Sequence, residues 1–192
     1  MKTLKNLGAM MALTAAAIGS VLAAPVNYTV DSSHTYPRFS YSHVGYSTQL
    51  SSFTNTSGIV VFDAAAKTGT VDIVIDMTSV NTGSTEFNSH IQSEDFLHTA
   101  KFPKATFKST KVLFDGDKLA SVEGQLTIKG VTKPVTLTVS SFQAMLHPMM
   151  RLPALGANAF TTIKRSEFGA GKYAPLVGDE LRIDIAIEAL AK

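Results

Sequence analysis

The sequence predicts an all-β protein, an antiparallel β-barrel of about eight strands with a short helix near one end. Apolar and polar residues alternate along several runs, and Gly, Asp or Asn residues separate these runs. Strands of about ten residues span roughly 33 Å, which is long for a β-sandwich and suits a barrel. A barrel of about eight strands is wide enough to hold one small ligand.

Strict alternation marks the clearest strands. Val71, Ile73 and Ile75 share one face of the run 70–78, and Leu181 and Ile183 do the same in 180–190. One buried and one solvent-exposed face is typical of such strands. The strands predicted from alternation and punctuation are 28–31, 38–44, 49–53, 58–62, 70–78, 104–114, 121–129, 134–140, 157–165 and 180–190.

Two segments depart from the period of two. Residues 85–97 place Phe87, Ile91 and Glu94 on one helical stripe, which predicts a short helix or two helical turns that cap an opening. Residues 143–156 are rich in Met and Leu and contain two prolines, which predicts an irregular stretch and not a central strand. This stretch is interpreted as a lid, a loop packed at the barrel mouth, or a dimer contact.

The first 23 residues are expected to be a cleaved signal peptide. Lys2 and Lys5 precede an apolar, alanine-rich stretch, and Val21-Leu22-Ala23 supplies small residues before the cut. The domain is then residues 24–192, and its expected location is the periplasm. Because Lys2 and Lys5 are two of 17 basic residues against 15 acidic ones, residues 24–192 are formally neutral. No basic patch indicates a nucleic-acid partner.

Composition and spacing argue against several functions. The chain has no cysteine, which excludes disulfides, thiolate zinc sites and a cysteine nucleophile. The five histidines show no His-x-His or His-Glu-x-x-His spacing, and no Gly-x-Ser-x-Gly motif occurs. We therefore expect no metal, no cofactor and no catalytic residue, so the protein is predicted not to be an enzyme. Charged residues on the polar strand faces predict no stable membrane insertion.

Inward apolar and aromatic side chains are the candidate ligand-binding residues. Phe39, Tyr41 and His43 are alternate residues of one predicted strand, so their side chains face the same side. A polar histidine beside two aromatic rings would suit the polar headgroup of a ligand. The stripe residues Val71, Val135 and Leu181 either line a pocket or fill a solid core. The predicted ligand-binding set is Phe39, Tyr41, His43, Phe53, Ile73, Ile75, Phe102, Phe107, Leu126, Ile128, Leu137, Phe142, Met149, Phe160, Ile183 and Ile185. Lys164, Arg165 and Glu167 are interpreted as a surface ion-pair set, with a headgroup contact by Arg165 as the alternative.

Several runs together resemble a known family. They are 31–34 (DSSH), 39–43 (FSYSH) with Gly45, 93–96 (SEDF), 102–110 (FPKATFKST), 124–134 (GQLTIKGVTKP), 163–169 (IKRSEFG) and 177–180 (VGDE). Over residues 31–189 the chain resembles the YceI-like family of periplasmic polyisoprenoid-binding proteins. The resemblance implies a lipocalin-like barrel, an elongated apolar pocket for an isoprenoid quinone or similar long-chain amphiphile, and a possible homodimer. The apolar stretch 143–156 departs from the family pattern.

The predicted function is binding, transport or storage of a long-chain isoprenoid or fatty amphiphile. Each buried methylene contributes about 0.8 kcal/mol, whereas association costs on the order of 4–15 kcal/mol, so a long tail is needed. One alternative is a lipid-acting hydrolase that uses a His–carboxylate pair. The other is a stress-related interaction module with no essential ligand, in which the dimer or the Met-rich stretch matters.

Overall fold

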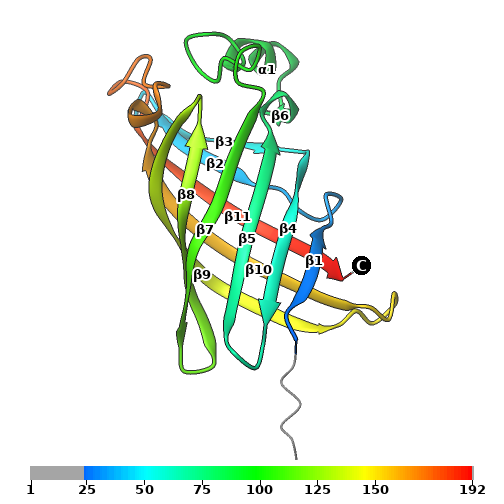
Figure 1. Ribbon diagram of the computed structural model, residues 1–192. Helices are drawn as coiled ribbons and strands as arrows, with labels where there is room; N and C mark the ends of the chain where they lie inside the picture. The colour runs from blue at the N-terminus through cyan, green and yellow to red at the C-terminus, as the bar shows by residue number, and fades with distance from the viewer. Residues whose placement is uncertain (1–23, 192) are drawn as a thin grey trace, which may run out of the picture.

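The structure, a computed structural model that describes residues 24–191, is built around one antiparallel β-sheet (Figure 1). The predicted signal peptide lies outside the described residues. The strands are β1 (Val26–Val30), β2 (Arg38–His43), β3 (Ser47–Phe53), β4 (Thr56–Asp63), β5 (Thr68–Asp76), β6 (Val80–Asn81), β7 (Lys104–Asp115), β8 (Lys118–Ile128), β9 (Val131–Leu146), β10 (Pro153–Lys164) and β11 (Glu180–Ala191). The helical elements are η1 (Met77–Ser79), α1 (Thr85–Ile91) and η2 (Arg165–Phe168).

The sheet closes on itself, which confirms the predicted barrel. Its ring runs in the order β1-β4-β5-β7-β8-β9-β10-β11 and closes through β1–β11 pairing, a ring of eight strands. Tyr28 pairs with Ala191 and Val30 with Ala189 across the closing seam. Because every ring strand has a neighbour on both sides, the ring has no free edge along its paired length.

β1 and β2 pair with different parts of β11. Ala189 and Ala191 pair with β1, whereas Arg182 and Asp184 pair with β2. From there β2 pairs with β3 and β3 with the short β6, so these three strands extend the wall at the end that α1 covers (Figure 1).

The predicted turns and alternation are found in the ring strands. Gly116 and Gly130, both with positive φ, lie in the β7–β8 and β8–β9 turns, where left-handed backbone favours glycine. The predicted helical segment 85–97 is shorter as a helix, because α1 ends at Ile91 and turns follow it. Ser84 caps α1, since its Oγ accepts a hydrogen bond from the Phe87 amide at 3.3 Å.

The segment 143–156 is not irregular, and the prediction was wrong there. It forms the end of β9, a turn, and the beginning of β10, with Leu146 opposite Pro153. Pro148 lies in the turn and Pro153 is the first residue of β10, so neither removes a hydrogen bond from the interior of a strand. The hairpin tip projects from the barrel away from α1 (Figure 1).

A β-bulge in β9 changes which side chains face inward. Asn158 pairs with Ser141 but the next residue, Ala159, pairs with Val139, so no residue of β10 lies opposite Ser140 in the register. The inward parity therefore passes from the odd-numbered Val139 to the even-numbered Phe142. Without the bulge, Phe142 would point out of the barrel.

Candidate functional site

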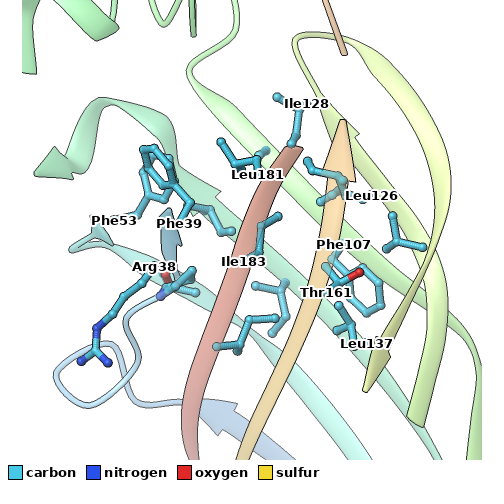
Figure 2. Close-up of a pocket in the computed structure, with 18 of the residues that line it drawn as sticks. Arg38, Phe39, Phe53, Phe107, Leu126, Ile128, Leu137, Thr161, Leu181 and Ile183 are labelled. Atoms are coloured by element: carbon cyan, nitrogen blue, oxygen red, sulfur yellow. The ribbon is translucent and has the colours of Figure 1, made fainter. Parts of the chain in front are cut away.

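The barrel interior contains a cavity of about 380 Å³ and is not filled by its own side chains. The inward stripes of β5, β8, β9 and β11 line it, as the alternation predicts, and Figure 2 shows several of them converging from neighbouring strands. These stripe residues are Val71, Ile73, Ile75, Leu126, Ile128, Val135, Leu137, Leu181, Ile183 and Ile185. The stripes are therefore pocket walls and not a solid core.

Three aromatic rings from β2 and β3 form one part of the wall. Phe39 stacks with Tyr41 at a ring-centroid distance of 6.4 Å and lies 5.5 Å from Phe53. His43 also lines the cavity, so the shared parity of these β2 residues is confirmed. Met77 and Ile91 pack against the same aromatic group, which places it next to α1.

Phe107 and Phe142 line another part of the cavity. The Phe142 ring meets Phe62 edge-on at 5.1 Å, and Phe107 is buried in the cluster that also contains Leu126 and Val122. Both rings are inward because of their strand parity, which for Phe142 depends on the bulge at Ser140.

Phe102, Met149 and Phe160 do not line the cavity, so the predicted placement of these three was wrong. Phe160 lies between the inward Ala159 and Thr161 and points outward, where the Arg182 guanidinium stacks 4.4 Å from its ring. Phe102 precedes β7 and packs edge-on against His98 at 5.7 Å. Met149 is 85% exposed at the tip of the β9–β10 hairpin.

The cavity reaches the surface at the end that α1 covers. Its exposed lining residues are Arg38, His43, His90 and Tyr173, from β2, α1 and the loop before β11. A chain of rings crosses this mouth: His90 lies 4.9 Å from Phe96, which lies 6.1 Å from Tyr173. The mouth is thus aromatic, with imidazole and phenol groups that can face a polar ligand end.

Arg165 is buried at the mouth and is not part of a surface ion-pair set, so that prediction was wrong. Its guanidinium donates to the carbonyl oxygens of Gly178 (2.8 Å), Ala170 (2.5 Å), Lys172 (2.9 Å) and Val177 (2.6 Å). These bonds fix the loop between η2 and β11. Glu167 instead pairs with Lys133, with Nζ–Oε2 at 3.5 Å.

Burial changes the electrostatics of the mouth. It lowers the pKa of Arg165, an effect that nearby Asp179 and Tyr41 oppose. Burial likewise raises the pKa of Tyr41, and the positive charge of Arg165 opposes that increase. Arg165 and Tyr41 both line the cavity, so a cationic donor and a neutral phenol lie together at its polar end.

Thr56 is a cavity residue that the sequence reasoning missed. Its side chain is 1% exposed, and its hydroxyl has no hydrogen-bond partner among the described residues. It shares the inward parity of Val60 on β4, and this parity was the signal that could have found it. An unpaired buried hydroxyl is costly, and this one has almost no accessible surface through which it could bond a ligand.

The histidines of residues 24–191 are not arranged for metal binding. No group of three or more His, Asp or Glu residues in that range is close enough to hold a metal ion. His34 and Asp31 form a His–carboxylate pair, with Nδ1–Oδ2 at 2.8 Å, but neither lines the cavity. The lining histidines His43 and His90 form no ion pair with an acidic side chain in the described part of the chain.

The helical elements of the described chain are short, and α1 has seven residues. No helix within residues 24–191 has the length and apolar character needed to cross a bilayer.

Comparison with known sequences gives a family match, relatives that align over part of their length and relatives that align over nearly all of it. The model of the YceI-like domain matches residues 28–189. Protein YceI of Escherichia coli O6:H1 is 45% identical over 123 residues, and the aligned part spans 62% of each chain. UPF0312 protein ECA1782 of Pectobacterium atrosepticum is 34% identical over 190 residues, 98% of this chain and 97% of the relative.

Solved structures share the barrel. BcnA of Burkholderia cenocepacia superposes with a TM-score of 0.70 at 26% identity and covers 83% of this chain and 99% of its own. A polyisoprenoid binding domain from Saccharophagus degradans, implicated in plant cell wall breakdown, has a TM-score of 0.65 over 87% of this chain and 99% of its own. At 18% identity, the second likeness demonstrates the fold alone.

Proposed function

This chain belongs to the YceI-like domain family, and from that premise and its cavity we propose that it binds a long-chain isoprenoid, or a similar amphiphilic lipid, in the periplasm. In this proposal the barrel shields the apolar tail from water while the lipid is stored or transported. The polyisoprenoid binding domain from Saccharophagus degradans has the same fold, so polyisoprenoids are the first ligand class to test.

The observation that carries the proposal is the apolar cavity of about 380 Å³ inside a closed barrel. A tail that moves from water into this cavity gains about 0.8 kcal/mol for each methylene, against an association cost on the order of 4–15 kcal/mol. Short apolar fragments would therefore bind poorly, and chains of ten or more buried carbons would bind well. The elongated wall from Phe39 through Ile183 to Phe142 suits such a chain.

The polar end of the ligand is placed at the mouth in this proposal. Tyr41, His43 and Arg165 line the cavity there, next to α1. A quinone carbonyl, a hydroxyl or another oxygen could accept a hydrogen bond from the Tyr41 phenol. Most of the remaining wall is aliphatic and aromatic, with a few threonines, which favours an amphiphile with a single polar end.

Native mass spectrometry of the protein purified from its own host tests the proposal. A stoichiometric lipid, identified by solvent extraction, would establish binding and give the ligand's class. A protein that arrives without lipid and does not take up added polyprenols, isoprenoid quinones or fatty acids would refute it. The same spectra report whether the protein is a monomer or a homodimer.

Two other functions remain as alternatives to be judged by that experiment. A hydrolase would need a His–carboxylate pair that faces the cavity, and the His34–Asp31 pair is outside it. An interaction module without an essential ligand is favoured by the exposed apolar side chains of the β9–β10 tip, which are Met145, Leu146, Met149, Met150 and Leu152. A lipid-free protein with a stable partner would support the interaction module.

A further inference from the structure

Two loops beside the cavity mouth expose apolar side chains to solvent. The β2–β3 turn presents Val44 and Tyr46, which are 44% and 91% exposed. The loop between η2 and β11 presents Tyr173 and Leu176, which are 54% and 71% exposed. We call these four side chains the mouth rim, since Tyr173 itself lines the cavity.

Backbone hydrogen bonds join the two loops of the mouth rim into one surface. The Val44 amide donates to the Leu176 carbonyl at 3.0 Å, and the Gly178 amide donates to the Ser42 carbonyl at 2.8 Å. An antiparallel bridge pairs His43 with Val177 between them. Because Arg165 also holds the second loop by its carbonyls, the exposed side chains sit on a fixed base.

The parts of the two loops that carry the mouth rim contain no formal charge. Residues 39–62 contain no Asp, Glu, Lys or Arg, and neither do residues 173–178. The two charged residues of the second loop flank residues 173–178 and have partners. Lys172 pairs with Asp95 at 3.3 Å, and Asp179 accepts a hydrogen bond from the Ser166 hydroxyl at 2.7 Å. The rim thus combines exposed aliphatic groups, two tyrosines and no unpaired charge.

We propose that the mouth rim docks on the surface of a lipid bilayer, with the cavity mouth facing the lipid. This inference rests on the proposed function, because it concerns how a membrane lipid reaches the cavity. Each methylene that must cross water disfavours transfer about fourfold, so a mouth in contact with the bilayer removes the largest barrier. Tyrosine has an apolar ring and a polar hydroxyl and is enriched at membrane–water interfaces.

The chain offers an internal comparison for this proposal. The β9–β10 tip is a second exposed apolar surface, but it projects away from the α1 end (Figure 1) and lines no part of the cavity. Nonspecific lipid binding by any exposed apolar surface would bring Met149 into contact with lipid as often as Tyr46. Docking through the mouth rim would bring Tyr46, and not Met149, into contact with lipid.

Single tryptophan reporters test the inference, because the chain contains no tryptophan of its own. Tyr46→Trp and Met149→Trp are compared in residues 24–192, whose ring closes without the first 23 residues. The probe is a vesicle of phosphatidylethanolamine and phosphatidylglycerol without isoprenoid. We expect the emission of the Tyr46→Trp protein to shift to shorter wavelength and to be quenched by brominated acyl chains, while the Met149→Trp protein is unchanged.

Three results would overturn the inference. One is an unchanged Tyr46→Trp spectrum, and another is an equal or larger shift for Met149→Trp. The third is a Tyr46→Trp shift that depends on protein concentration and not on vesicles, because the rim would then face a second copy of the chain.

A loss-of-contact variant gives an independent readout. Leu176→Ser should lower the vesicle-bound fraction in flotation about tenfold, whereas Met149→Ser should leave it unchanged. Because the rim is uncharged, binding should be nearly the same at low and high salt, and a steep salt dependence would contradict docking through these side chains. Thermal unfolding of each variant verifies that the barrel is intact.

Failure of this inference can be told from failure of the proposed function. A protein that carries a stoichiometric lipid but gives no Tyr46→Trp shift retains the proposed function and refutes docking. A protein that neither carries nor takes up lipid, but whose Tyr46→Trp emission still shifts with vesicles, supports docking and refutes the proposed cargo.

Discussion

The ring of Phe107 occupies the space that a side chain at Gly124 would need. A Cβ atom at Gly124 would collide with the Phe107 Cζ atom and lie 2.6 Å from the Lys108 carbonyl oxygen. Gly124 is opposite Ser109 on β7, and the ring leans across the sheet over it. The glycine therefore lets Phe107 lie flat against the barrel wall and keeps the cavity open.

Gly124→Ala should destabilise the barrel by about 2 kcal/mol, because the backbone oxygen cannot move aside and the ring must turn into the cavity. Urea unfolding followed by circular dichroism measures the loss. Gly156→Ala is the matched control, since the nearest atom to its new Cβ is 3.7 Å away. Similar midpoints for the two variants would contradict the role assigned to Gly124.

Filling the cavity should abolish lipid binding without unfolding the barrel. Ala157 lines the cavity, so Ala157→Phe adds a ring where the tail would lie. We expect at least about a tenfold loss of affinity, which corresponds to about 1.4 kcal/mol. Asn158→Phe changes the adjacent, outward position and should bind as the wild type does. The lipid-to-protein ratio in native mass spectra measures both, and equal ratios would place the ligand elsewhere.

Arg165→Lys should be strongly destabilising although it preserves the charge. A lysine ammonium cannot reach the four carbonyl groups that the planar guanidinium joins, and hydrogen bonds from a charged group contribute about 1.5–3 kcal/mol each. A loss of about 3 kcal/mol is expected in denaturant unfolding. Arg182→Lys, at an exposed residue paired with Asp184, is the control and should change stability by less than about 1 kcal/mol. A wild-type midpoint for Arg165→Lys would show that the carbonyl contacts are dispensable.

The Asp31–His34 pair should make stability depend on pH in two windows. Hydrogen bonds from Ser33 and His34 lower the pKa of Asp31 from 3.8 to about 2. The stability that the ionised Asp31 contributes is therefore complete above pH 3.8 and is lost as the pH falls toward 2. The hydrogen bond to Asp31, with its negative charge, raises the pKa of His34 from 6.5. The His34 contribution is complete below 6.5 and is lost as pH rises through the raised pKa.

Thermal unfolding at about pH 5 and about pH 8 detects the upper window. From the lower to the higher pH, the melting temperature of the wild type should fall by more than that of His34→Gln. His90→Gln, outside the pair, should follow the wild type. A parallel pH dependence in the wild type and His34→Gln would exclude the pair as its cause.

Strand alternation predicted the barrel and most of the cavity wall, because parity decides which side chains face inward. Its failures have local causes. Phe160 was predicted to bind the ligand because it is aromatic. Its neighbours Ala159 and Thr161 face the cavity, however, so Phe160 lies on the outer face of β10. Phe142 lies inside only because of the β9 bulge, which alternation alone cannot reveal.

Arg165 could not be placed from the sequence, because its four partners are backbone carbonyls of a loop whose course depends on the fold. The prolines of the 143–156 segment were misleading for a different reason. Pro148 and Pro153 occupy a turn and a strand start, the positions where a missing amide hydrogen costs little.

The seam between β1 and β11 also governs how the protein folds. Tyr28 and Ala191, from the first and the last ring strand, must meet before the circle of hydrogen bonds is complete. Such distant pairing is slow, with folding on the millisecond-to-second scale for β-rich chains. A chain still lacking β11 has a gap between β1 and β10, and its apolar interior remains open to water. The binding compartment is therefore complete only once this seam has formed.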